Sequence, residues 1–243
     1  MPNYLHALLA GLLAASLAAP ARAQSLPLPP YEARYQVYAA GIPLGEAVVT
    51  LKDEGNGRYS MSSRVQPNDF AALLVSDRIS EQASGEFRKD NFRPLSYEQR
   101  HQDGKETNVT TLAFDWKASK LKARHNAEQA TLPLTADVVD PLSLHLAARW
   151  DLKSGRTPDR YTIVDDTELK TYQIRMEGKE TLKTPLGALE TQRVSQQKPG
   201  SSRVTTFWFA PALDYLVVQV AQRKDGKEVL RMVIQDARGV ERK

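Results

Sequence analysis

The feature that most constrains this chain is a two-residue alternation of apolar and polar side chains that returns many times after residue 30. Successive side chains of a β-strand point to opposite faces, so this alternation predicts strands with one face on a core and the other toward water. The clearest runs cover residues 31–39, 58–65, 171–177 and 229–234. The chain is therefore expected to be mostly β.

Three dipeptides between alternating segments predict where strands reverse. They are Asn56-Gly57, Asp103-Gly104 and Asp225-Gly226. Such pairs supply the two positive φ angles that a two-residue type I′ turn requires, so each predicts a β-hairpin. The sheet is therefore expected to be antiparallel.

Two segments break the alternation. Asp140-Pro141 has the form of a helix start, with Asp as N-cap and Pro at the first helical position, and Gly155 is a suitable stop. Three apolar residues then fall on one helical face: Leu142, Leu146 and Trp150. The second segment is the continuous apolar run Phe70–Val75, which is either a short helix or a buried strand.

The fold class expected from these patterns is mainly β. We expect a single strongly curved antiparallel sheet or incomplete β-barrel of about ten strands, with one central helix packed across it. No domain boundary is evident, so residues 31–236 are predicted to form one domain. A Pro-rich spacer, 24–30, precedes it, and a polar C-terminal tail, 237–243, follows it.

Residues 1–23 are expected to be a cleaved export signal. The apolar run from Ala7 to Ala19 has about 13 residues, against roughly 20 for a membrane-spanning helix. It is followed by Ala21-Arg22-Ala23, which predicts cleavage after Ala23. No Lys or Arg precedes the run, which departs from the usual signal pattern. A periplasmic mature chain without a transmembrane segment is the expectation.

Composition narrows the possible functions. The chain has no Cys, so lipid attachment at cysteine, thiolate catalysis and thiolate metal sites are excluded. The mature chain would carry a small positive charge with acids and bases interleaved, and no basic block suggests nucleic acid. We expect the mature protein to be soluble and not lipidated.

No catalytic constellation is visible in the sequence. His101, His125 and His145 are far apart in the chain and have no metal-ligand spacing. Ser119-Lys120-Leu121-Lys122 fits an S-x-x-K pattern, but the companion motifs of penicillin-binding enzymes are missing. The expectation is a protein that is not an enzyme and has no metal or cofactor.

Apolar and aromatic side chains exceed what a sheet with one polar face needs. Five of them are predicted to line a cleft for a hydrophobic or lipid-like ligand, with ordinary core packing as the alternative: Phe70, Leu73, Leu74, Trp150 and Trp208. A curved sheet with a helix across its mouth would provide such a cleft.

Several short motifs resemble the bacterial exported family called domain of unknown function 3108. They are Tyr35-x-Val37, Gly41-Ile42-Pro43-Leu44-Gly45, Asp140-Pro141-Leu142-Ser143, Thr184-Pro185-Leu186-Gly187, and Trp208-Phe209-Ala210 leading to Leu216-Val217-Val218. The resemblance covers about residues 31–234. It implies a periplasmic β-rich protein similar in outline to lipoprotein-carrier half-barrels, and it brings no catalytic residues.

Three functional hypotheses remain open. The first is a non-enzymatic periplasmic protein that binds a hydrophobic ligand. The second is a structural or assembly factor that binds other proteins of the cell envelope. The third is an envelope hydrolase, which would require one of the three histidines to meet Asp or Ser in a cleft.

Overall fold

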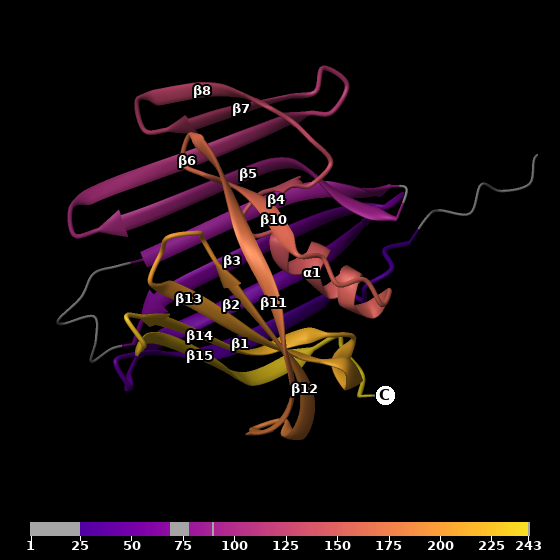
Figure 1. Ribbon diagram of the computed structural model, residues 1–243, viewed down its shortest axis with the longest axis vertical. Helices are drawn as coiled ribbons and strands as arrows, with labels where there is room; N and C mark the ends of the chain where they lie inside the picture. The colour runs from indigo at the N-terminus through magenta and orange to yellow at the C-terminus, as the bar shows by residue number, and fades with distance from the viewer. Residues whose placement is uncertain (1–24, 69–77, 89, 243) are drawn as a thin grey trace, which may run out of the picture.

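The computed structural model describes residues 25–68, 78–88 and 90–242. Fifteen strands in these ranges form one sheet, in the order β8-β7-β6-β5-β4-β3-β2-β1-β15-β14-β13-β12-β11-β10-β9. Neighbouring strands are antiparallel except β9 and β10, which are parallel. The expected fold class, a mainly β chain with one curved antiparallel sheet and one helix, is confirmed (Figure 1). The expected number of about ten strands was too low.

The first part of the chain forms the strands β1 (Tyr31–Ala39), β2 (Ile42–Gly55), β3 (Arg58–Pro67), β4 (Arg78–Arg88), β5 (Asn91–Asp103), β6 (Glu106–Asp115), β7 (Lys120–His125) and β8 (Glu128–Pro133). The second part forms β9 (Val138–Val139), the helix α1 (Leu144–Lys153), β10 (Arg160–Asp165), β11 (Glu168–Thr184), β12 (Gly187–Gln197), β13 (Arg203–Ala210), the 3-10 turn η2 (Pro211–Leu213), β14 (Leu216–Lys224) and β15 (Lys227–Arg238).

The clearest alternating runs do not include the strands β7, β8 and β9, although β7 does alternate between exposed and buried residues. β7 and β8 have six residues each, and their sequences are Lys-Leu-Lys-Ala-Arg-His and Glu-Gln-Ala-Thr-Leu-Pro. Such charged or mixed sequences have few of the β-branched and aromatic residues that favour strands. Pairing with neighbours, rather than local propensity, makes these segments extended.

A short connection forces the sheet to close on itself. β8 and β9 lie at opposite ends of the strand order, yet β8 ends at Pro133 and β9 begins at Val138. Five residue steps span at most about 18 Å, so the two edges must lie near each other. The long strand β11 also contacts β8, and in Figure 1 it runs across the open side of the sheet. The sheet is therefore an incomplete barrel.

The helix α1 is the crossover between the two parallel strands β9 and β10. Parallel neighbours cannot be joined by a tight hairpin, and here the connection carries α1 across the open side of the sheet (Figure 1). Asp140 Oδ1 accepts hydrogen bonds from the backbone N–H groups of Leu142 and Ser143 at 2.9 and 2.7 Å. Asp140 therefore caps the turn that precedes the helix. The helix itself begins at Leu144 with Ser143 as its N-cap, so the prediction of Asp140 as N-cap and Pro141 as the first helical residue was wrong by three residues.

The turns agree with the sequence pattern except at one place. Asn56-Gly57 and Asp225-Gly226 have positive φ at both residues, as type I′ turns require. The hairpin of β5 and β6 pairs Asp103 with Glu106, so its central residues are Gly104 and Lys105. The prediction of a type I′ turn centred on Asp103-Gly104 was wrong by one residue, because glycine takes the first central position instead.

The core lies on the inner face of the sheet. In β1 and β3 most of the inward residues predicted from alternation are buried, including Tyr31, Ala33, Tyr59 and Met61, whereas the last ones are only partly buried. The segment before β1 also contributes, because Leu28 is fully buried. At the other terminus, β15 continues to Arg238, which is two residues into the segment expected to be a polar tail.

No helix among the described residues is long and apolar enough to span a membrane.

Candidate functional site

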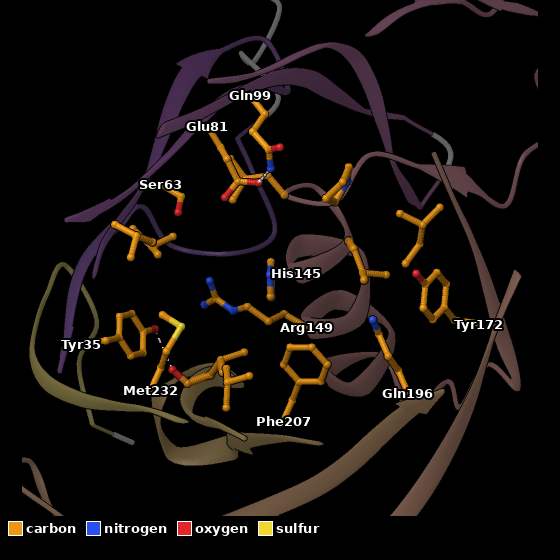
Figure 2. Close-up of a pocket in the computed structure, with 18 of the residues that line it drawn as sticks. Tyr35, Ser63, Glu81, Gln99, His145, Arg149, Tyr172, Gln196, Phe207 and Met232 are labelled. Atoms are coloured by element: carbon orange, nitrogen blue, oxygen red, sulfur yellow. Dashed lines mark hydrogen bonds between the residues drawn. The ribbon is translucent and has the colours of Figure 1, made fainter. Parts of the chain in front are cut away.

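A cavity of about 440 Å³ lies between the inner face of the sheet and the N-terminal half of α1 (Figure 2). Strands from both halves of the sheet order, from β5 on one side to β10 on the other, contribute to its wall, so the curvature of the sheet creates it. Its lining residues are Tyr31, Tyr35, Val49, Ser63, Val65, Glu81, Gln99, Pro141, Leu142, Leu144, His145, Arg149, Ile163, Val164, Asp165, Tyr172, Gln196, Phe207, Val217, Val220 and Met232.

Most of this lining is apolar. Alternation in β2 and β3 turns Val49 and Val65 inward, while Val217, Val220 and Met232 contribute from β14 and β15. Tyr35 is buried, and its hydroxyl donates a 2.8 Å hydrogen bond to the Val217 backbone oxygen. The tyrosine therefore presents mainly its ring to the cavity.

Arg149 reaches into the cavity from α1, although its side chain is fully buried. Its Nε and Nη2 donate to the Asp214 backbone oxygen at 3.3 and 3.2 Å, and its guanidinium carbon lies 4.7 Å from the centre of the Tyr31 ring. Its Nη1 has no hydrogen-bond partner. Burial lowers the pKa of Arg149, and the partial negative charges around it counteract this only in part.

His145 lies one helical turn before Arg149 and lines the same cavity. Its ring meets the Phe207 ring edge-on, with 5.6 Å between the ring centres. Burial, together with the nearby Arg149 charge, lowers the pKa of His145 to about 4. His145 is therefore neutral at pH 7.

The opposite side of the cavity carries polar groups. Figure 2 shows Ser63, Glu81 and Gln99 on one side and Tyr35, Phe207 and Met232 on the other, with the helix residues between them. Glu81 Oε1 accepts hydrogen bonds from the Tyr97 hydroxyl at 2.8 Å and from Gln99 Nε2 at 3.4 Å. These bonds hold the carboxylate against the wall of β4 and β5.

Asp140 lies where α1 meets this cavity, just before the lining residues Pro141 and Leu142. It is fully buried, and its Oδ2 has no hydrogen-bond partner. Burial raises the pKa of Asp140 to about 6, although the backbone and side-chain hydrogen bonds at Ser143 act in the opposite direction.

The residues predicted to contact a ligand lie elsewhere or outside the described ranges. Trp150 is on α1 and donates from Nε1 to the Asp90 backbone oxygen at 2.8 Å. Trp208 is buried on β13 and donates to Glu180 Oε2 at 3.0 Å. The cavity lining includes neither tryptophan. Phe70, Leu73 and Leu74 fall outside the described residues. Ligand contact by these five residues stays a prediction.

The cavity lining does not include the other two histidines. His101 is on β5, opposite Asn108 of β6. His125 Nδ1 lies 2.9 Å from Thr110 Oγ1 and 3.0 Å from Asp166 Oδ1. A hydroxyl, imidazole and carboxylate relay needs the two partners on different ring nitrogens. Both contacts here use Nδ1, so the group links β6 and β7 to the β10–β11 turn without forming a relay. Within the described residues, no three His, Asp or Glu side chains gather as a metal site.

Sequence reasoning missed Arg149 as a site residue. The available signal was its position on the predicted helix, four residues after His145 and seven after Leu142, where it shares an inward-facing side with both. A basic residue on the buried side of an amphipathic helix is unusual enough to mark a candidate site.

Residues 34–233 match the family model described as protein of unknown function, DUF3108. The chain belongs to the DUF3108 family. Among solved structures, this DUF3108 protein is similar to a β-barrel-like protein of the DUF1849 family from Brucella abortus, with a TM-score of 0.56 and 11% identity over 88% of this chain and 98% of that one. That similarity shows a shared fold.

A second solved structure, described as an exported protein of YmcC-like fold from Bacteroides fragilis, aligns with a TM-score of 0.34 and 10% identity, covering 89% of this DUF3108 chain and 99% of that one. No curated protein matches the sequence significantly.

Proposed function

We propose that this DUF3108 protein is a non-enzymatic, exported protein of the periplasm that binds a hydrophobic, lipid-like ligand in the cavity beneath α1. The observation that carries the proposal is the cavity itself, about 440 Å³ with a mostly apolar lining. Pockets that bury small-molecule ligands generally have volumes of about 300–1,000 Å³ and combine apolar walls with a few polar groups. This cavity has both properties.

The cavity favours ligand binding over a purely structural role. A scaffold that offers only its surface gains stability by filling its interior, because voids lose packing contacts. An interaction surface would instead expose a large apolar patch. Among the described residues, the large apolar side chains that are exposed are Ile42, Met176 and Val229. We therefore give more weight to the apolar lining of the cavity than to these three exposed residues.

Two observations support a non-enzymatic role. The His145 ring packs against Phe207 and is neutral, with Arg149 as its charged neighbour. The hydroxyl of Thr110 and the carboxylate of Asp166 both contact the same ring nitrogen of His125, Nδ1. Export is supported by the apolar run and the Ala21-Arg22-Ala23 sequence at the N-terminus.

Two adjacent valines on β2 provide a test of ligand binding. Val49 lines the cavity, and Val48 precedes it in the strand, so its side chain points to the opposite face. The periplasmic protein, delipidated and checked by intact mass for a start at Gln24, is titrated with the neutral apolar dye N-phenyl-1-naphthylamine. We expect saturable binding that Val49→Phe weakens at least about tenfold, because the larger side chain fills the cavity.

The matched variant Val48→Phe should bind the dye as the unaltered protein does. Thermal unfolding of both variants checks that each is folded. The proposal fails if the unaltered protein shows no saturable binding, or if both phenylalanine variants bind the dye equally well.

A further inference from the structure

Arg149 has the largest fully buried side chain in the described part of the chain, and this side chain is charged. Its Nη1 makes no hydrogen bond. Two of its nitrogens donate to the Asp214 backbone oxygen, and the guanidinium lies over the Tyr31 ring. Burying a cation costs considerable free energy, and the attraction of the Asp214 carboxylate and the neighbouring tyrosines offsets this cost only in part, because the pKa of Arg149 is still lowered. Figure 2 shows this group extending from α1 into the middle of the cavity.

Of the carboxylates near the cavity, three have other partners, whereas Asp140 is fully buried and its Oδ2 has no hydrogen-bond partner. Asp214 Oδ1 pairs with Lys153 Nζ at 2.9 Å, and Asp165 Oδ2 pairs with Lys170 Nζ at 2.7 Å. Glu81 is held by Tyr97 and Gln99 on the far wall. His145 is neutral, so Arg149 provides the positive charge on the helix side of the cavity.

We propose that the ligand of this cavity is a single-chain amphiphile with an anionic head group, which pairs with the Arg149 guanidinium while its chain lies along the apolar wall. The inference rests on the proposed function and specifies its ligand class. Guanidinium groups bind carboxylates and phosphates through charge-assisted hydrogen bonds, and Nη1 is available for one. The cavity volume lies toward the small end of the usual range for ligand pockets, which suits one chain better than two.

The guanidinium has no exposed area, so the head group must displace a neighbouring side chain to reach Nη1. Met232 lines the same cavity and is partly buried. Its unbranched thioether side chain can change rotamer at low cost. Met232 is therefore the side chain that we expect to move when the ligand binds.

The test compares four compounds as competitors of bound N-phenyl-1-naphthylamine: palmitate, hexadecyl phosphate, hexadecanol and acetate. The first three share the chain and differ in the head group, while acetate has the charge without the chain. We expect palmitate, hexadecyl phosphate or both to bind at least about tenfold more tightly than hexadecanol, and acetate not to compete. The stronger of the two acids identifies the head group as carboxylate or phosphate.

Substitution of Arg149 tests whether this residue binds the charged head group. Arg149→Met should reduce the affinity for the acids to that for hexadecanol, and Arg149→Lys should retain part of the preference. Arg156→Met is the matched control, because Arg156 pairs with Asp151 outside the cavity and its loss changes the net charge equally. It should keep the full preference.

Equal binding of palmitate, hexadecyl phosphate and hexadecanol by the unaltered protein would overturn the inference, and so would a preference that survives in Arg149→Met. The comparison in the unaltered protein decides the matter even if Arg149→Met does not fold. Failure of the proposed function looks different, because then the neutral dye itself does not bind.

Discussion

The space between the sheet and α1 has two ends that are built differently. Under Trp150 it is filled by a chain of aromatic rings: Trp150 meets Phe87 edge-on at 5.2 Å, Phe87 lies 5.1 Å from Phe92, and Phe92 meets Tyr59 at 5.5 Å. Around His145 and Arg149 the same space stays open as the cavity. One helix therefore closes the core at one end and leaves room at the other.

The two ends differ because different side chains of α1 face them. Leu146 and Trp150 pack only in the main core, where Leu146 is buried, while the buried Leu142 belongs to both the core and the cavity lining. His145 and Arg149 point between the two walls of the cavity (Figure 2). A helix that needed only to cover the sheet would carry apolar residues at these two positions. Their polar character supports the proposal that the open end binds a ligand.

The largest expected effect on stability comes from removing an aromatic side chain at the filled end. Phe92→Ala should lower the free energy of unfolding by about 3–5 kcal/mol, because it leaves a void between Tyr59 and Phe87. Phe207→Ala at the open end should cost clearly less, since its ring already faces a cavity. Urea unfolding of both variants measures the difference. Equal losses would show that the two ends are packed alike.

The next effect concerns pH, where Asp140 and His145 act in opposite directions. Burial raises the pKa of Asp140 from 3.8 to about 6, so the folded state holds this proton more tightly and stability falls as pH rises from 4 to 6. Burial lowers the pKa of His145 from 6.5 to about 4, so stability rises with pH over nearly the same range. In the unaltered protein the two contributions largely cancel.

Substituting either residue should reveal the pH dependence of stability that the other residue contributes. Relative to the unaltered protein, Asp140→Asn should add a rise in stability from pH 4 to 6 of up to about 3 kcal/mol, while His145→Gln should add a fall. The asparagine oxygen can still accept the two backbone hydrogen bonds that Asp140 Oδ1 accepts. Urea unfolding at pH 4, 5, 6 and 7 measures these slopes. The same slope in both variants would show that the two groups are not buried as described.

The smallest effect distinguishes packing from binding at Trp150. Trp150→Phe removes the hydrogen bond to the Asp90 oxygen and should lower the free energy of unfolding by about 1 kcal/mol. Because the cavity lining does not include Trp150, binding of N-phenyl-1-naphthylamine should stay unchanged. A weaker affinity for the dye would instead place this tryptophan at the ligand, as its sequence pattern predicts.

The sequence predicts those parts of the fold that local chemistry decides. Alternation identifies the inward faces of β1 and β3, the Asn-Gly and Asp-Gly pairs identify hairpins, and Asp140 marks the entry to the helix. The signal is weaker for β7 and β8, which are short and contain few β-branched or aromatic residues, and both pair with their neighbours in the sheet. The sequence does not predict the parallel pairing of β9 with β10, because that contact depends on how the distant edges of the sheet meet.

The site is less predictable for a related reason. Trp150 and Trp208 attract attention as large aromatics, yet both hydrogen-bond to nearby groups within the fold. The cavity is assembled from side chains that are ordinary in sequence, such as Val49, Val65 and Met232, because curvature of the sheet brings their strands together. Only Arg149 departs from its local pattern, and a buried arginine is recognisable only once the inner side of the helix is known.

The pairing of β1 with β15 has a consequence for how the protein folds. β1 is near the start of the chain and β15 ends at Arg238, yet eight residue pairs join them in the centre of the sheet. Contacts between such distant segments form slowly, because a long loop must close first. The two halves of the sheet cannot be joined until the last strand has been made. A chain that is exported before β15 has been synthesised would therefore cross the membrane before its sheet is complete, and no complete fold would have to be unfolded first.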